Sequence, residues 1–162
     1  MAADGIIERL VGTAPGSELA AALAARSRIM ELSQAAHDAV LSPKDPGGLT
    51  HAERAALAER MARMHGDAAA AAHYAALPAA GEAGIAALRD PAAMPQDGRG
   101  AALARHVDLL TRSPREATRG DIDALREAGL GEPDIVRLSE LVAFVNYQLR
   151  VIAGLRLLQE AA

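Results

Sequence analysis

Cysteine is absent from the 162 residues of this chain. A thiolate is the nucleophile in thiol-dependent peroxide reduction and in disulfide exchange, and no carboxylate, amide or methyl group replaces it. Both reactions are therefore excluded, and so is stabilisation by disulfide bonds. The absence agrees with a reducing compartment, because disulfides persist mainly in oxidising ones.

Aromatic residues are nearly absent as well. Phe, Tyr and Trp together make up 2% of the chain, whereas hydrophobic residues make up 51% and forty residues are Ala. Burial of apolar surface yields roughly 25 cal/mol per Å², and Ala contributes little of that surface. We expect contacts between subunits to supply part of the stability, so the composition predicts a homo-oligomer.

The chain also lacks any block of like charges, and its net charge is −4. Nucleic acid and an anionic membrane surface are therefore not expected as partners. Arg outnumbers Lys sixteen to one, which together with the Ala excess resembles the coding bias of a GC-rich bacterial genome. The first residues lack the basic and apolar regions of a signal peptide, and no run of about eighteen apolar residues occurs. These features predict a cytoplasmic, soluble protein.

Apolar periodicity and capping residues predict an all-α chain of about six to eight helices, with no strand alternation. The loop from Ser42 to Gly48 is the predicted internal boundary, between an N-terminal helical arm (1–48) and one compact helical unit (49–162). The predicted helical segments cover residues 4–10, 17–41, 50–64, 68–77, a segment ending near 89, 99–112, a segment starting at 121, and 133–159.

The helix that starts after Thr50 carries the clearest N-terminal signal. Thr50 and Glu53 form a predicted capping box, in which the Thr50 hydroxyl accepts from the Glu53 amide and the Glu53 carboxylate reaches back. The spacing places Leu57, Met61 and Met64 on one face and predicts that Glu59, Arg60 and Arg63 face water. Gly66 ends this helix, Asp67 caps the next, and Pro78 stops that one.

The C-terminal third is the best-specified part of the predicted core. Asp121 is the predicted N-cap of one helix, Gly129 its C′ residue, and Pro133 lies in the first turn of the last helix. Apolar residues recur every three or four positions there, wide enough for a central helix. They are Ile135, Leu138, Val142, Val145, Leu149 and Ile152.

These motifs together resemble the carboxymuconolactone decarboxylase and alkylhydroperoxidase D superfamily, in particular its branch of uncharacterised peroxidase-related proteins. The resemblance covers residues 49–158: Leu-Thr-x-x-Glu-Arg, a helix, a Gly and a His-bearing helix, then the pattern from Asp121 through Asn146, Tyr147 and Arg150 to Leu155. It implies an alkylhydroperoxidase D-like helical bundle that assembles as a trimer or hexamer.

The peroxidase members of that superfamily use a Cys-x-x-Cys pair followed by a His, with a Glu on the preceding helix. Aligned forward from the capping box, the two cysteine positions fall on Asp67 and Ala70 and the histidine on Tyr74. Aligned backward from Gly81, they fall on Gly66 and Ala69, with His73 as the histidine. Neither alignment contains sulfur, so the chain is a cysteine-free member by this resemblance.

Four residues form the candidate pocket: Glu53, Asp67, His73 and Tyr74. In the cysteine-free decarboxylase branch, His and acidic groups replace sulfur, so His73 could act as base and Tyr74 as donor. Each also has a structural explanation, as filler among small Ala side chains or, for Glu53 and Asp67, as a helix cap. Asn146 and Arg150 are four residues apart and are interpreted as a structural hydrogen-bond network.

No cofactor or metal is predicted. The chain has no Gly-rich phosphate loop followed by Lys, no Gly-x-Ser-x-Gly elbow and no paired-Gly dinucleotide fingerprint. His65 and His73 lie eight apart with no third ligand, and the remaining histidines lack metal-ligand spacing with them. Those remaining histidines are His37, His51 and His106.

Three functions remain open at this point. The leading hypothesis is a non-redox structural or regulatory oligomer, whose partner is another copy or an active paralogue. The second is a cofactor-free decarboxylase or other lyase, with His73 as base, Tyr74 as donor and Glu53 or Asp67 orienting. The third is a small-molecule binding protein that uses the same pocket.

Overall fold

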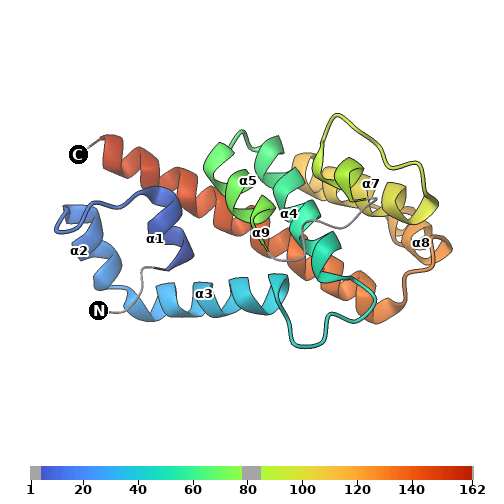
Figure 1. The fold of residues 1–162 in the computed structure, drawn as a ribbon, viewed down its shortest axis with the longest axis horizontal. Coiled ribbons are helices and arrows are strands. Elements are labelled where there is room, and N and C mark those ends of the chain that lie inside the picture. Colours follow the sequence, from blue (N-terminus) through green and yellow to red (C-terminus); the bar gives the residue numbers. More distant parts are fainter. Residues whose placement is uncertain (1–4, 78–84, 162) are drawn as a thin grey trace.

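Helices account for the architecture, as the periodicity predicts. A computed structural model describes residues 5–77 and 85–161, and within them the chain forms nine α-helices, one 3₁₀ turn and no strand (Figure 1). The all-α prediction is confirmed. The elements are α1 (Ile6–Val11), α2 (Glu18–Ala24), α3 (Ser27–Leu41), α4 (His51–Met64), α5 (Ala68–Ala75), α6 (Ala86–Arg89), α7 (Gly98–Arg112), η1 (Pro114–Glu116), α8 (Arg119–Glu127) and α9 (Glu132–Glu160).

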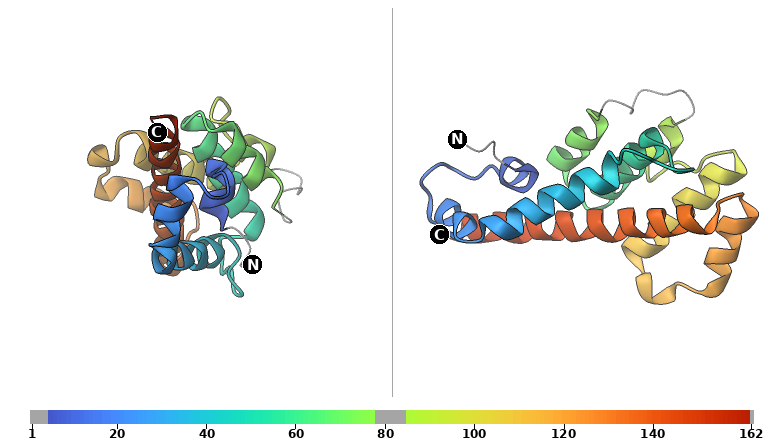
Figure 2. Two further views of the ribbon diagram at one scale, coloured as in Figure 1. Left: turned by 90° about the vertical axis from the view of Figure 1, so that its left-hand side faces the viewer. Right: turned by 90° about the horizontal axis from the view of Figure 1, so that it is seen from below.

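The 29-residue helix α9 is the element around which the others pack. Figure 1 shows α1 and α2 beside its C-terminal end and α7 and α8 near its N-terminal end, and Figure 2 shows α3 running alongside it. All six apolar positions expected to face the core are buried. Length and composition would also allow α9 to cross a membrane, and the core helix of a soluble protein has the same properties.

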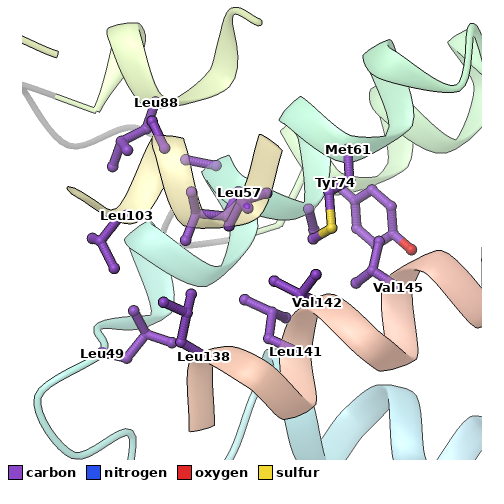
Figure 3. Packing of buried hydrophobic residues seen from close by; sticks show 14 of the residues in the cluster. Leu49, Leu57, Met61, Tyr74, Leu88, Leu103, Leu138, Leu141, Val142 and Val145 are labelled. Carbon is purple, nitrogen blue, oxygen red and sulfur yellow. The ribbon is translucent and has the colours of Figure 1, made fainter. Parts of the chain in front are cut away.

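The main hydrophobic core lies between α4, α5, α7 and α9. Its buried members among the described residues are Leu, Ile, Val, Met and Ala together with one aromatic residue, Tyr74, which Figure 3 shows close to Met61 and Val145. The partly buried Phe144 packs against this core. A second, smaller cluster joins Ile6, Ile7 and Val11 of α1 to Ile152 of α9. Helices with small side chains can approach one another closely, so this interior is filled although it contains few aromatic residues.

Local signals place several helix ends correctly. The Thr50 hydroxyl accepts from the Glu53 amide at 3.1 Å, and the Glu53 carboxylate accepts from the Thr50 amide at 2.8 Å, so the capping box is present. Asp67 caps α5 by accepting from the Ala70 amide at 3.0 Å, after Gly66 has turned the chain with a φ of 71°. Left-handed backbone of this kind costs Gly no steric strain.

Two helix boundaries differ from the prediction. The segment expected as one helix from Ser17 to Leu41 is broken near Arg26, whose backbone is not helical (φ −117°, ψ 27°), so α2 and α3 are separate helices. The helix expected to begin at Asp121 begins at Arg119 instead. Its N-cap is Thr118, and the Asp121 carboxylate reaches back to the Thr118 amide at 2.7 Å, as an N3 acid does in a capping box. The expected stop at Pro78 and the turn at Gly81 lie outside the described residues.

The prediction that Glu59 and Arg60 face water is wrong. Their side chains are 2% and 1% exposed, because α6 and α7 cover that side of α4. Arg60 donates to both carboxylate oxygens of Asp108 on α7, at 2.6 and 2.7 Å, and to the Asp90 carbonyl at 2.6 Å. A buried guanidinium is tolerated only when its donors are paired in this way.

A second buried guanidinium, that of Arg54, organises the loop between α3 and α4. It donates to three backbone carbonyls, those of Val40 at 2.8 Å, Leu49 at 2.9 Å and Pro46 at 3.0 Å. Burial lowers the pKa of this guanidinium, with nearby Arg137 acting in the same direction. One side chain of α4 thus fixes where the chain leaves α3 and enters α4.

Candidate functional site

The four predicted pocket residues do not form one site. Glu53 lies at the start of α4, where its carboxylate accepts from Arg99 Nε at 2.9 Å in addition to its capping role. Asp67 lies in the turn before α5, where it accepts from Arg156 Nη1 of α9 at 2.8 Å. Each carboxylate is therefore committed to an arginine and to a helix N-terminus, and neither has a described contact with the His73 ring.

His73 and Tyr74 both belong to α5 but face different surroundings. Tyr74 is fully buried, and its hydroxyl donates to Gln148 Oε1 on α9 at 2.8 Å. Burial raises the pKa of this phenol, with Asp67 acting in the same direction. The Tyr74 hydroxyl is therefore neutral at physiological pH and already bound inside the core.

His73 is partly exposed at the edge of the core, and its ring packs against that of His37 from α3. The two Nε2 atoms lie 3.4 Å apart. Burial, followed by the influence of His37 and Arg9, lowers the pKa of His73 from 6.5 to about 4. The ring is consequently neutral at pH 7 and is a much weaker base than an ordinary histidine.

His37 and Gln148 are the residues that sequence reasoning missed. His37 Nδ1 lies 3.2 Å from Gln148 Oε1, the same oxygen that accepts from Tyr74. An amide oxygen only accepts, so His37 carries its proton on Nδ1 and leaves Nε2 as the acceptor for the His73 N–H. Burial lowers the pKa of His37, which favours this neutral form.

The result is a buried hydrogen-bonded cluster, which we call the His–Tyr–Gln cluster. It consists of His37 from α3, His73 and Tyr74 from α5, and Gln148 from α9. Among the described residues, only the Gln148 Nε2 atom of these four side chains is buried without a partner. The cluster joins three helices that are far apart in sequence, and it contains no carboxylate.

A sequence signal for Gln148 was present. Val145, Gln148 and Ile152 are spaced by three and four residues, which puts a polar amide on the apolar face of a core helix. A polar residue in such a place needs a buried partner. His37 likewise lies on one face with Ser33 and Leu41, although no spacing within the chain identifies Gln148 as its partner.

Asn146 takes part in a second hydrogen-bond network, separate from the His–Tyr–Gln cluster. It donates to the Val142 carbonyl at 3.0 Å and to Thr111 Oγ1 at 3.1 Å, and its own oxygen lies 2.8 Å from His65 Nε2. These contacts join α9 to α7 and to the end of α4. Structural use of Asn146 fits this geometry, whereas Arg150 is exposed.

Of the four positions that the resemblance aligns with a cysteine pair, three have clear structural roles here. Ala70 is buried in the core, Asp67 is the cap bound to Arg156, and Gly66 forms the left-handed turn. No group of three or more metal-ligating side chains occurs in residues 5–77 and 85–161. What the arrangement offers chemically is one partly exposed neutral imidazole backed by a fixed, buried hydrogen-bond chain.

Comparison with known proteins identifies a similar fold but does not assign the chain to a family. No family model matches the sequence, and no curated protein matches it. Among solved structures, the chain is similar to an uncharacterised peroxidase-related protein from Silicibacter sp. TM1040, with a TM-score of 0.60 and 19% sequence identity. The match covers 77% of this chain and 66% of that one. At this identity the likeness is one of fold.

Proposed function

We propose that this chain is a cysteine-free protein on a peroxidase-related fold and that it acts as a non-redox homo-oligomer with a structural or regulatory role. The observation that carries the proposal is that three of the four candidate reactive side chains are already bound to other groups of the protein, while the fourth, His73, is a weak base. Glu53 and Asp67 are bound to arginines, and the Tyr74 hydroxyl is bound within the core. The resemblance to the carboxymuconolactone decarboxylase superfamily agrees with this role, since the thiol pair of its peroxidases has no counterpart here.

Exposed apolar side chains on two adjacent helices support self-association. Val136, Tyr147 and Leu158 of α9 are 56%, 43% and 62% exposed and are spaced by eleven residues, close to three full turns. Ile29 and Leu32 of α3 are about half exposed, and the Tyr147 hydroxyl lies 3.3 Å from Ser33 Oγ of that helix. Together these residues form what we call the α3–α9 face.

A second copy of the chain is the proposed occupant of the α3–α9 face, in a trimer or hexamer. Leu, Val and Tyr side chains exposed in a row lose contact with water when such a face is covered, which favours association. An active paralogue with the same fold could present the same kind of surface and is the alternative partner.

Light scattering coupled to size-exclusion chromatography tests this proposal. Wild type is expected to elute as an oligomer, and Val136→Glu/Leu158→Glu as a helical monomer. Met94→Glu is the matched control, because Met94 is 40% exposed in the loop before α7 and lies off the α3–α9 face. A monomeric wild type, or a face variant that remains oligomeric, would refute the oligomer proposal.

The non-redox part has its own assay. Metal-free protein mixed with cumene hydroperoxide and a dithiol is expected to consume peroxide no faster than buffer. Measurable peroxide consumption by such material would contradict the proposal, whatever the oligomeric state.

Partial exposure of His73 favours one second candidate, a cofactor-free lyase or small-molecule binding protein that uses His73 and Tyr74. The lowered pKa of His73 weakens it as a base, so binding is the better supported of the two. Turnover of a lactone or a β-keto acid that His73→Ala abolishes would establish the lyase and overturn the non-enzymatic proposal.

A further inference from the structure

A cavity of about 590 Å³ lies in the N-terminal part of the fold, remote in sequence from α5 and α9. It is lined by residues of α1, of the segment between α1 and α2, of α2 and of α3. Figure 1 shows these three helices together at one end of the fold. Pockets that hold small molecules usually measure about 300–1,000 Å³. The cavity is therefore large enough for a compact organic ligand.

The lining combines apolar side chains with polar ones, and its charged side chains are all acidic. Leu23, which is 7% exposed, and Met30 supply apolar surface together with several Ala side chains. Three carboxylates, those of Glu8, Glu31 and Asp38, belong to the same lining, whereas none of the lining residues is Lys, Arg or His. Carboxylates without lining cations repel anionic ligands and attract cationic ones.

Two further contacts show how the polar groups are held. Gln34 donates to Asp38 Oδ1 at 2.8 Å and accepts from the Ile6 amide at 2.8 Å, which fixes α1 against α3 and holds the Asp38 carboxylate through a neutral partner. The hydroxyl of Thr13, also in the lining, is buried without a partner in the described part of the chain. A hydroxyl in this state can accept a hydrogen bond from a ligand N–H.

We propose that this cavity binds an organic ammonium ion with an apolar body, such as a protonated arylalkylamine. The apolar part lies against Leu23 and Met30, and the ammonium group is bound by Glu8 and Asp38. Glu31, whose described partner is the exposed Arg28 at 3.3 Å, contributes at the rim. None of the four residues of the His–Tyr–Gln cluster belongs to this lining, although Asp38 directly follows His37 on α3, and the site does not depend on the function proposed above.

Titration of the full-length chain with phenethylamine, followed by calorimetry and by amide NMR shifts, tests the proposal. Saturable binding is expected, with shifts centred on Thr13, Leu23 and Met30. Phenylethanol and phenylacetate have nearly the same shape but are neutral and anionic, and each is expected to bind at least about tenfold more weakly, since a charge-assisted hydrogen bond is lost.

Substitutions in the cavity distinguish it from weak surface binding. Ala24→Trp places an indole in the cavity and is expected to abolish binding, whereas Ala22→Trp on the opposite side of α2 leaves it unchanged. Asp38→Asn is expected to weaken phenethylamine about tenfold, whereas Glu18→Gln, outside the lining, has no effect. Circular dichroism confirms that each variant is folded.

Three results would overturn the proposal. They are the absence of saturable phenethylamine binding at millimolar concentration, equal affinity for phenethylamine and phenylethanol, and unchanged binding in folded Ala24→Trp. None of them bears on oligomeric state or on peroxide consumption, so failure here and failure of the proposed function are separate outcomes.

Discussion

Replacement of Arg60 by Met is expected to remove a large part of the stability of this fold. The Arg60 side chain is 1% exposed, and its guanidinium is bound to Asp108 by two hydrogen bonds and to the Asp90 and Ala93 carbonyls at 2.6 and 3.1 Å. Met fills a similar volume without any donor. The variant therefore leaves a carboxylate and three backbone carbonyls, those of Ala87, Asp90 and Ala93, without their donor.

The magnitude follows from what remains buried. Removing one partner of a buried ion pair costs about 3–5 kcal/mol. The Asp108 side chain is still 17% exposed, so water can solvate part of the released charge, and the lower end is expected. A loss of about 3 kcal/mol corresponds to a decrease in Tm of about 6–12 °C for a chain of this length.

Guanidinium denaturation and calorimetry measure this loss in three variants. Arg60→Met/Asp108→Leu is expected to regain a substantial part of the stability, because it removes the unpaired carboxylate as well. Arg28→Met is the control: its pair with Glu31 is exposed, and its effect should stay within about 0.5 kcal/mol. The reasoning is refuted if Arg60→Met costs no more than Arg28→Met, or if the double variant is no more stable than Arg60→Met.

Three further predictions concern other contacts within the fold. The lowered pKa of His73 means that its native form excludes a proton that the unfolded chain binds, so the free energy of unfolding should decrease as pH falls from 6.5 towards about 4, and His73→Gln should flatten that slope in denaturant titrations. Arg54→Met should cost about 2–4 kcal/mol and accelerate amide exchange across residues 42–49, since three carbonyls lose their donor. In Gly48→Ala, the new Cβ would collide with the Asp134 carboxylate, which accepts from the Gly48 amide at 2.9 Å, and a loss of about 1–2 kcal/mol in thermal unfolding is expected. Gly120→Ala is the control and should cause no loss, because the nearest atom is 3.5 Å away and Ala favours the helix.

Much of the fold follows from short-range patterns. The capping box at Thr50, the cap at Asp67 and the left-handed Gly129 are decided by residues three or four apart, so the sequence alone identifies them. The apolar face of α9 can be predicted equally well, because the spacing of its apolar residues matches the helical period over many turns. The sequence does not predict the break at Arg26, because no Gly or Pro occurs there. The break is seen only in the folded chain, where α2 and α3 run in different directions (Figure 1).

The contacts of the candidate site residues could not be predicted from the sequence, for a physical reason. The resemblance to the superfamily predicts a pocket of Glu53, Asp67, His73 and Tyr74, yet both carboxylates pair with arginines from α7 and α9. The contacts of His73 and Tyr74 are instead with His37, 36 residues from His73, and with Gln148, 74 residues from Tyr74. Long-range pairs of this kind leave no local periodicity.

The sequence by itself determined the helices, the composition of the core and the absence of thiol chemistry, since each depends on residue type and on neighbours within a few positions. Only the tertiary structure decided which polar side chains are buried and which groups they bind. Arg60 has the sequence context of a surface residue, and only the approach of α7 gives it Asp108 as a partner and removes it from water. The cavity between α1, α2 and α3 is of the same kind, because its walls come from segments that meet only after folding.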